Sequence, residues 1–577
     1  MKRLTYIVLV LAAMLASCKD DYLETAPSTA VGEIDLLQSP EIFDSYMDGI
    51  NTDIYDIYYS NVWRGVMKLN INLDYLGDDW MNTVPATYLA FYRWEANNDP
   101  TSNHSYVYWD FNYTLVERTN RVIALASKVK EASEIQINTW LAEAHAIRAY
   151  AYHNLVQLYG KRYVKGQSND NPGVLLRLSV NFDPMPRSTV AEVYAQINDD
   201  IQKSISYYAS GLDLGRKDRI RPSTAYGIAS RIALTQEDWT LAAQYADSAI
   251  KLSGATLQSG KELIDGFNNK NATEWMWGYS YNAAQNPGYS GFFCYHAYNF
   301  DGYATKYAAN RTLLNKMSDN DIRWKWFICY DRGDKIPSDV GEGAMGERFS
   351  GTNNGLPGWE FTAAPIKWKV PDETKSKGDQ LVMRLAEMYY IKAEALAKAG
   401  DEAGAKATLV KIMETRDPDY TAAKVASLAG DDLVNEIMLH RTIDLFGEGF
   451  RFLDMKRTRT LPVRDTIAQQ QAYIAYGERY KNTYMPEVEA ALAKLRAQLD
   501  TTVTADTVKI QKAIAEWQAD SVFLAVTIPA RCQSRCQLLG SRRKAYTLPV
   551  SLDDNRWEFV IPIDEIQGNP LCTQNPM

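Results

Sequence analysis

Histidine, the side chain most often used for proton transfer and metal binding near neutral pH, is rare in this 577-residue chain. No two histidines lie three or four residues apart, the spacing that places two metal ligands on one face of a helix. The five are His104, His145, His153, His296 and His440. The histidines therefore do not predict a metal centre of this kind.

Glycine-rich stretches also fail to match the motifs of nucleotide-binding or nucleophilic enzymes in their required context. Residues 341–346 have the glycine spacing of a dinucleotide site, but they lie in a polar loop rather than after an apolar strand. Residues 254–261 miss the phosphate-loop spacing by one position, and residues 288–291 lack the spacing of a nucleophile elbow. Carboxylate pairs are common, but no spacing shows two held about 5 to 9 Å apart, as a glycosidase requires. We predict a protein that is not an enzyme, with no cofactor and no metal ligands.

Several acids and bases stand close together in predicted helices and could be read as acid–base sites. On a helix, residues three and four apart share a face, so such charges more often pair and brace contacts between helices. We predict this structural role for the following groups: Glu143 with Arg148, Arg384 with Glu387, and Arg441 with Glu448, Arg451 and Asp454.

Two stretches, 78–94 and 279–307, mix aromatic rings with Asp and Asn. Sugars present apolar C–H faces ringed by hydroxyl groups, so a receptor needs exposed rings beside hydrogen-bonding side chains, and loops on a rigid scaffold can expose them. The predicted ligand-binding residues are Asp79, Trp80, Asn82, Tyr88, Trp94, Tyr281, Asn282, Tyr289, Tyr295 and Tyr298. The alternative is that these rings pack the small core of a loop-rich region.

The first 18 residues have the pattern of a lipoprotein signal. A basic start precedes an apolar run over 4–15, which is shorter than the roughly 20 residues that span a bilayer. Leu15, Ala16 and Ser17 then precede Cys18, which favours cleavage before Cys18 and acylation of that residue. Lys19, Asp20 and Asp21 after it resemble the surface-export signal of some bacterial lipoproteins, which implies a position on the cell exterior. We therefore expect a signal peptide over 1–17 and a lipid anchor with an extended tether over 18–40.

Composition excludes some classes of partner. The net charge of −9 and the pI near 5.4 argue against nucleic-acid binding, which needs a basic face. Six cysteines in a chain of this length do not form a disulfide scaffold. The sequence leaves open whether Cys532 and Cys536 pair.

Apolar residues recur at steps of three and four in eight stretches, each of which predicts a helix. The stretches are 105–130, 140–159, 191–208, 223–235, 239–252, 384–399, 402–415 and 433–446. Gly160 and Gly447 are predicted to cap two of them at the C-terminal end. Because neighbouring helices are joined by short polar turns, we predict tetratricopeptide-like pairs that stack to bury their apolar stripes.

The predicted fold is therefore mostly α, a single domain over 41–577 in which an α–α superhelix carries an irregular lobe with short strands. The scaffold is expected at about 41–252 and 381–460, and the loop-rich lobe at about 253–380. Residues of about 460–545 predict a helical hairpin with charged outer faces, inserted before a final segment over 546–577.

Four stretches together resemble the SusD/RagB family of nutrient-uptake lipoproteins. They are LAEAHAIRAYAYHNLVQLYG over 141–160, RLAEMYYIKAEA over 384–395, HRTIDLFGEGFRFLDMKR over 440–457, and IPIDEI over 561–566 followed by NP at 569–570 and QNP at 574–576. The segment 78–82 is similar to the family's early acidic segment, and Glu274 with Trp275 is similar to a strand that leads into binding loops. The 460–545 insertion departs from the family pattern.

The resemblance implies a glycan-binding lipoprotein, anchored in the outer membrane through acylated Cys18 and facing the exterior. It implies delivery of ligand to a SusC-like TonB-dependent transporter. Three alternatives stay open: a peptide-binding lid of a RagA-like transporter, a surface-anchored glycoside hydrolase, and a pure interaction scaffold with no ligand pocket. The sequence does not identify the ligand.

Overall fold

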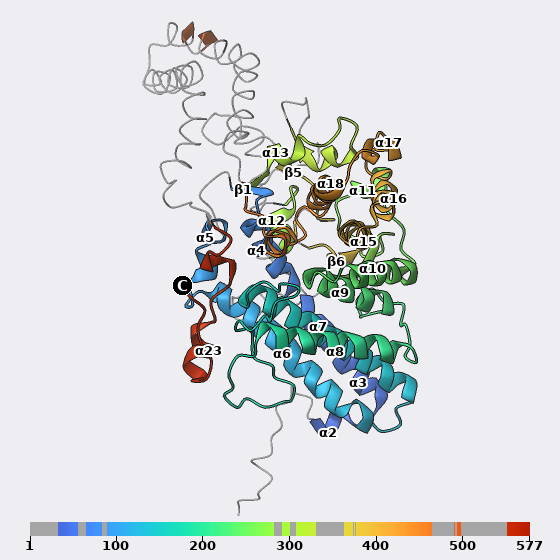
Figure 1. Cartoon of the computed structure of the whole chain (residues 1–577), viewed down its shortest axis with the longest axis vertical. Helices are drawn as coiled ribbons and strands as arrows, with labels where there is room; N and C mark the ends of the chain where they lie inside the picture. The colour runs from blue at the N-terminus through green and yellow to red at the C-terminus, as the bar shows by residue number, and fades with distance from the viewer. Residues whose placement is uncertain are drawn as a thin grey trace, which may run out of the picture.

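The computed structural model describes residues 33–55, 65–82, 89–281, 291–300, 307–329 and 551–577, residues 363–463 except 373 and 376, and a few positions between 490 and 497. These residues form a stack of α-helices with short strands in the upper half of the view in Figure 1. The mostly α fold class is confirmed. In the part of the chain that the structure describes, no helix is both long and apolar enough to cross a membrane.

The helical frame contains the longer helices of the chain. They are α3 (Pro40–Tyr55), α4 (Val66–Leu76), α6 (Asn103–Leu125), α7 (Glu134–Tyr159), α8 (Val190–Tyr208), α9 (Pro222–Thr235), α10 (Trp239–Ser253), α15 (Leu385–Lys398), α16 (Glu402–Met413), α18 (Gly430–Asp444) and α19 (Arg451–Thr458). All eight helices predicted from apolar periodicity are present, with ends shifted by a few residues.

Local signals in the sequence explain where these helices begin. Ser133 and Gln136 form a capping box at the start of α7, and Thr189 and Glu192 form another at the start of α8. Pro222 occupies the first turn of α9, where its missing N–H costs nothing. Gly160 is the C-cap of α7, as predicted, with extended rather than left-handed backbone (φ −101°, ψ 160°).

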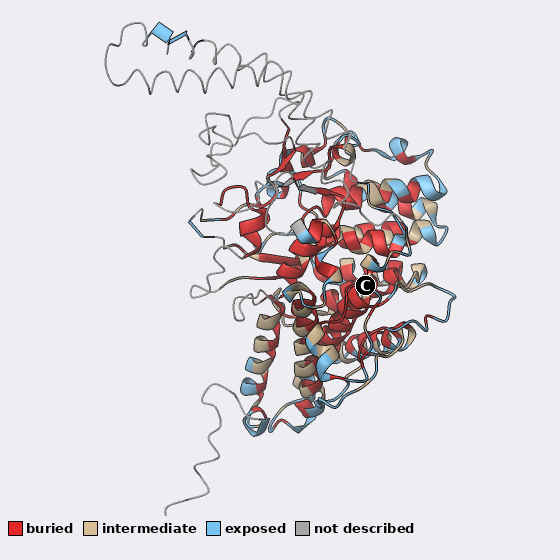
Figure 2. Cartoon of the chain, turned by 90° about the vertical axis from the view of Figure 1, so that its left-hand side faces the viewer, coloured by how far each residue is buried: buried red, intermediate tan, exposed pale blue. Residues whose placement is uncertain are grey.

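Helices that are neighbours in the sequence pack against each other, as in tetratricopeptide-like pairs. Helix α7 packs between α6 and α8, α9 packs on α10, and α15 packs on α10, α16 and α18. Figure 2 shows buried residues running through the whole stack. Each helix thus buries its apolar stripe against its neighbours, as stacked helix pairs require.

Short elements fill the irregular regions. The short helices are α2 (Glu33–Leu36), α5 (Leu89–Tyr92), η2 (Ala96–Asn98), η3 (Ala126–Lys128), α11 (Gly260–Leu263), α12 (Phe292–His296), α13 (Arg311–Leu314), η6 (Ile322–Trp326), α17 (Ala422–Val425), η10 (Asn555–Trp557) and α23 (Ile563–Gly568). The strands are β1 (Trp80–Asn82), β2 (Trp275–Tyr279), β3 (Tyr307–Ala309), β4 (Phe327–Ile328), β5 (Ala364–Pro365) and β6 (Gln380–Arg384).

The strands form three antiparallel pairs, β1 with β3, β2 with β6 and β4 with β5. Each pair joins segments that are far apart in the sequence. The β2–β6 pair holds the loop-rich region to the start of α15, because Arg384 ends the strand and Leu385 begins the helix. The predicted helical hairpin at about 460–545 and the cysteines Cys532 and Cys536 lie outside the described residues, apart from a few positions between 490 and 497.

Candidate functional site

Trp80, predicted as an exposed ring for ligand stacking, is wholly buried. Its ring stacks on Phe446 at 4.6 Å between centroids and meets Tyr75 and His296 edge-on. Gly447 makes this packing possible, since it has φ +75° and an added Cβ would lie 2.7 Å from Trp368 Nε1. A ring with 0% exposure has no face to offer a sugar, so the prediction of an exposed Trp80 is wrong.

Trp94 is buried as well. Its indole Nε1 donates to the carbonyl of Leu76 at 3.0 Å, and its ring meets Phe452 and Trp557 edge-on at 5.3 and 4.7 Å. Trp94 thus ties the first aromatic stretch to α19 and to the C-terminal segment. The prediction that it is exposed in a binding loop is wrong, because the same ring fills a gap between three distant segments.

Three more predicted residues, Asp79, Tyr295 and Tyr298, are also buried. Tyr295 and Tyr298 lie in and just after α12, which packs against α4. The carboxyl group of Asp79 has its pKa raised well above the usual range by burial and by the nearby carboxylates of Asp74 and Asp78. The prediction that these three side chains are open to ligand is wrong for the same reason as for Trp80.

The structure does not contradict the other five predicted residues, which remain candidates for ligand contact. Tyr281 is half-buried, with its ring edge-on to Tyr55 at 5.8 Å. Asn82 is the last residue of β1, where the structure describes its backbone but not its side chain. Tyr88, Asn282 and Tyr289 lie outside the described residues.

The structure does bring the two predicted stretches together. Strand β1 belongs to the first stretch and pairs antiparallel with β3 at the end of the second, placing Trp80 opposite Ala309 and Asn82 opposite Tyr307. Asn310 fixes the other end of this ladder, because its N–H donates to the Asp79 carbonyl and its Nδ2 to the Asp78 carbonyl. In an antiparallel pair, the chain that leaves one strand and the chain that enters the other meet at the same end. The chain that leaves β1 after Asn82 and the chain that enters β3 at Tyr307 therefore join the ladder at the same end.

Beneath the ladder, burial keeps His296 neutral. Its Nε2 lies 3.0 Å from Asp74 Oδ2, and Asp74 also accepts the N–H of Gly449 at 2.8 Å. Burial lowers the pKa of His296 to about 3 and raises that of Asp74 well above its ordinary value. In the middle of α7, burial together with the charge of Arg231 likewise lowers the pKa of His153 to about 3.

The depressed histidine pKa values predict loss of stability in acid. The unfolded chain binds a proton near pH 6.5, whereas folded His153 does so only near pH 3, so stability falls as the pH drops through this window. Between about pH 8 and about pH 5 we expect each such histidine to cost roughly 2 kcal/mol of unfolding free energy. Urea denaturation at the two pH values measures this loss. In His153→Gln, which has no imidazole to protonate, the loss of unfolding free energy should be smaller by roughly 2 kcal/mol. An equal loss in the variant and in the unchanged chain would contradict the prediction.

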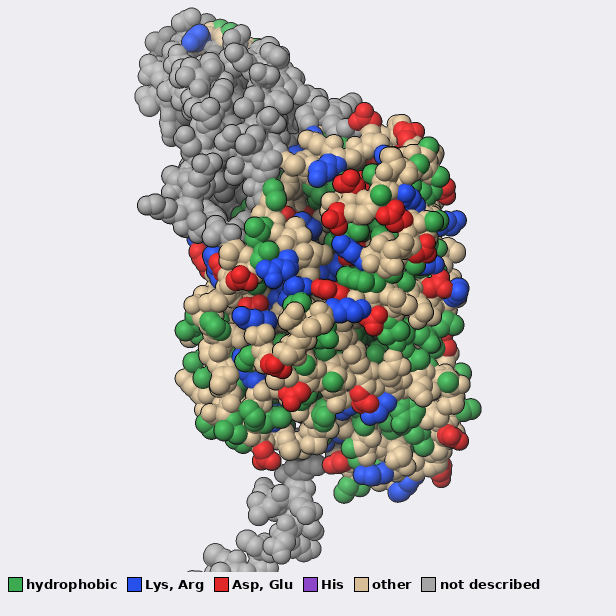
Figure 3. Space-filling view, viewed as in Figure 1, with side chains coloured by type: hydrophobic (Ala, Val, Ile, Leu, Met, Phe, Trp, Pro, Cys, Tyr) green, Lys and Arg blue, Asp and Glu red, His purple; other side chains and the backbone are tan. Residues whose placement is uncertain are grey.

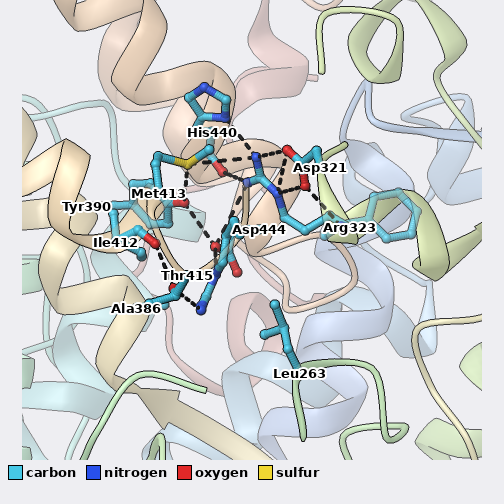
Figure 4. Close-up of polar contacts among 12 residues, drawn as sticks. Leu263, Asp321, Arg323, Ala386, Tyr390, Ile412, Met413, Thr415, His440 and Asp444 are labelled. Atoms are coloured by element: carbon cyan, nitrogen blue, oxygen red, sulfur yellow. Dashed lines mark hydrogen bonds and ion pairs between the residues drawn. The ribbon is translucent and has the colours of Figure 1, made fainter. Parts of the chain in front are cut away.

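The family-like stretches meet in a buried charge cluster rather than in an open site. Arg384 Nη1 donates to Glu274 Oε1 at 2.6 Å, and its Nη2 donates to Asp444 Oδ1 at 2.7 Å. Asp444 also accepts from Arg416 Nε at 2.8 Å. Figure 4 shows Asp444 beside Arg323, which pairs with Asp321. The cluster contains four cations and four carboxylates, all buried: Arg323, Lys367, Arg384, Arg416, Glu274, Asp321, Asp444 and Glu448.

The electrostatics of the cluster fit a structural brace. Burial alone would raise the pKa of Asp444, but the guanidinium groups of Arg416, Arg384 and Arg323 hold it well below its usual range. Arginine thus holds Asp444 as an anion, and all four carboxylates of the cluster are buried. An acid or base in catalysis has to reach a substrate, and these groups do not.

The charged pairs predicted from helical spacing are braces, but most have other partners. Glu143 binds Arg219 at 2.7 Å, Arg148 binds Asp200 at 2.6 Å, and Glu387 binds Arg231 at 2.6 Å. Arg441 does pair with Asp454, at 2.8 Å. The structural role is confirmed, while the pairings of Glu143 with Arg148 and of Arg384 with Glu387 are wrong.

Sequence reasoning missed a cleft that does carry exposed apolar groups. Its volume is about 370 Å³, and one face of α6, the 177–184 loop and α23 form its walls. Phe182 is 79% exposed at its edge. The aromatic and polar residues that line it include Tyr106, Trp109, Asp110, Tyr113, Asn120, Arg177, Asn181 and Asp564. The sequence signal that could have found this loop is the alternation of Leu178, Val180 and Phe182 outside any predicted helix.

Comparisons with known proteins agree with the fold. Residues 236–577 match the family model described as the SusD family, and residues 85–234 match a model described as starch-binding, associating with the outer membrane. A search of curated proteins finds no match.

Solved structures share the architecture at low sequence identity. A SusD superfamily protein from Bacteroides thetaiotaomicron has a TM-score of 0.65 and 17% identity, covering 93% of this chain and 100% of its own. A SusD superfamily protein from Bacteroides vulgatus has a TM-score of 0.65 and 18% identity over 93% of this chain and 99% of its own. A SusD-like carbohydrate binding protein from Bacteroides vulgatus has a TM-score of 0.63 and 21% identity over 74% of this chain and 85% of its own. Because one family model matches more than half of the residues, the chain belongs to the SusD family.

Proposed function

We propose that this chain is a cell-surface lipoprotein that binds a glycan and delivers it to a SusC-like TonB-dependent transporter. Acylated Cys18 would hold it on the outer membrane, facing the exterior. Family membership and the starch-binding description of the matched 85–234 model support the class of ligand and the membrane. Holding the ligand next to a transporter would raise its effective concentration at the channel.

The observation that carries the proposal is the β1–β3 ladder. It joins two stretches rich in rings and amides at the Asn82–Tyr307 end, on top of a core that is sealed by Trp80 and its neighbours. A rigid base from which loops extend is the usual setting of a binding site. We place the ligand at this end of the ladder, with Asn82, Tyr88, Tyr281, Asn282 and Tyr289 as the residues that contact it.

The chemistry of such contacts is simple. A tyrosine ring packs on the C–H face of a sugar, and asparagine offers both a donor and an acceptor to neighbouring hydroxyl groups. Contacts of this kind are individually weak, which suits a protein that has to release its ligand to a partner. Delivery therefore needs moderate affinity rather than very tight binding.

Burial of the carboxylates favours binding over hydrolysis. Glycoside hydrolysis requires two carboxyl groups that reach the scissile bond. Glu274, Asp444 and Glu448 stand close together but are buried and engaged by Arg384. The family model that matches residues 85–234 is described as starch-binding, which favours a glycan over a peptide as the ligand.

Replacing Tyr281 is expected to weaken glycan retention without unfolding the chain. Its ring is half-buried at the edge of one candidate loop, so Tyr281→Ala removes a ring face open to a sugar at the cost of some packing against Tyr55. The protein lacking Cys18 would be screened on a glycan array, and the best glycan would be cast in a native affinity gel. We expect about tenfold weaker retention for Tyr281→Ala.

Two matched variants make the result specific. Tyr245→Ala removes another half-buried tyrosine, in α10 of the helical frame, and should leave retention unchanged. Tyr106→Ala tests the α6 cleft, which would be the site if only this variant loses retention. Retention of peptides but of no glycan would contradict the proposed ligand class.

A further inference from the structure

A broad groove runs across the helical frame, and no residue of the β1–β3 ladder lines it. Its volume is about 680 Å³, within the range of about 300–1,000 Å³ typical of ligand sites. Helices α13, α15, α18 and α19 and the turn between α9 and α10 form its walls. Figure 3 shows Lys and Arg side chains gathered in a hollow in the middle of this face.

The groove is basic in a chain that is acidic overall. Six cationic side chains line it, against three carboxylates. The cations are Arg162, Lys316, Lys398, Arg451, Arg457 and Arg459, and the acids are Glu237, Glu394 and Asp431. Since the whole chain carries a net charge of −9, this excess of positive charge is local and would concentrate anions at the groove.

Three of the six cations form short ion pairs with acidic side chains of the fold. Arg457 binds Glu394 at 2.6 Å, and Arg162 binds Glu237 at 2.8 Å. Arg451 binds Asp78 at 2.5 Å. These three are structural, since their charges are neutralised within the fold.

The other three cations keep their charge available. Lys398 lies 3.5 Å from Asp431, which is 93% exposed, and Arg459 lies 3.7 Å from Asp553, which is 90% exposed. Ion pairs this long and this exposed contribute little. Lys316 is exposed and forms no ion pair with any residue in the described ranges.

Two residues that line the groove adopt the left-handed backbone conformation. Arg459 ends α19 with φ +56°, and Glu237 lies in the α9–α10 turn with φ +59°. Residues other than glycine rarely adopt this left-handed conformation, and such strain clusters at binding sites.

Trp239 supplies an apolar wall beside these cations. It begins α10, is half-buried, and lines the groove together with Leu439 and Leu313. An indole flanked by cations suits a ligand that has both an apolar ring face and a negative charge. A sugar acid combines these two properties, whereas a neutral sugar leaves the cations without partners.

We propose that this groove binds a short anionic oligosaccharide, with Trp239 packing on a sugar ring and Lys316, Lys398 and Arg459 pairing with its carboxylate or sulfate groups. The proposal rests on the proposed function, which it extends by naming a charged class of glycan and a second subsite. The two sites have no lining residue in common, so the residues of each can be changed with those of the other intact.

The test is calorimetric titration of the full mature chain lacking Cys18 with three probes. Trigalacturonate carries carboxylates, a chondroitin sulfate tetrasaccharide also carries sulfates, and maltotriose is neutral. We expect binding of at least one anionic probe, weakening as salt is raised, and weaker binding of maltotriose. Arg459→Asn and Lys316→Gln should each reduce the affinity about tenfold. Asparagine tolerates the left-handed backbone, so Arg459→Asn removes the charge with little added strain.

Control variants separate the possible outcomes. Lys325→Gln removes an exposed lysine of η6 that does not line the groove, and it should leave the affinity unchanged. Tyr281→Ala should also leave binding of the anionic probe unchanged. The proposal is overturned if neither anionic probe binds, or if Lys325→Gln weakens binding as much as Arg459→Asn. If only Tyr281→Ala weakens it, the groove is overturned as the site while glycan binding at the ladder stands.

Discussion

Asp444→Asn is expected to lower the free energy of unfolding by about 3–5 kcal/mol, or to prevent folding, because it removes one charge of a buried balanced cluster. Asp444 accepts from Arg384 and Arg416 at 2.7 and 2.8 Å and from the Tyr390 hydroxyl at 2.9 Å. Without its charge, buried guanidinium groups lose their main counter-ion and cannot regain water. Circular dichroism during urea denaturation measures the change.

A control on the same helix keeps this prediction specific. Asp431→Asn removes an acid of α18 that is 93% exposed, and we expect it to change the stability by no more than about 0.5 kcal/mol. If Asp444→Asn costs under about 1 kcal/mol, the buried charge cluster is not what holds the sheet β2–β6 to α16 and α18.

Trp80→Ala is expected to cost about 3–5 kcal/mol of stability, as other large-to-small changes in a core do. The ring is wholly buried, stacked on Phe446 and covered by Tyr75 and His296. Its loss leaves a cavity under the β1–β3 ladder, so any loss of glycan binding should accompany loss of stability. The measurement is the denaturation midpoint together with retention in the affinity gel.

Phe182→Ala is the matched control, since this large ring is 79% exposed and its removal should change the stability by about 0.5 kcal/mol or less. An unchanged midpoint for Trp80→Ala combined with lost retention would restore Trp80 as a contact residue and contradict its place in the core.

The helices could be predicted because their signals are local. The apolar period of α7, its capping box at Ser133 and the turn before Trp239 all act within a few residues. The frame could then be inferred, because amphipathic helices joined by short turns have to stack.

The charge partners could not be predicted because they are tertiary. Glu274 lies 110 residues from Arg384 in the sequence, yet the two side chains meet at 2.6 Å. Helical spacing offered Glu387 as a nearer candidate, but the β2–β6 ladder turns Arg384 toward Glu274 and leaves Glu387 to Arg231. Spacing along one helix carries no information on which other helix will pack beside it.

The predicted ligand residues failed for a different reason. Rings beside acids and amides, such as Trp80, Trp94 and Tyr295, suit sugar binding, but the same ring chemistry suits a core with polar edges. Trp94 shows this dual nature, because its indole donates to the Leu76 carbonyl while its ring packs on Phe452. The meeting of the two stretches in the β1–β3 ladder was beyond sequence reasoning, since each strand has only three residues.

Hydrogen–deuterium exchange with and without the glycan selected on the array tests the central claim most directly, because it locates the ligand along the chain. Glycan is expected to slow exchange in the peptides that cover 79–92 and 281–309, on both sides of the β1–β3 ladder. Saturating glycan that leaves these peptides unchanged, while protecting residues elsewhere or none at all, would contradict a binding site at this ladder.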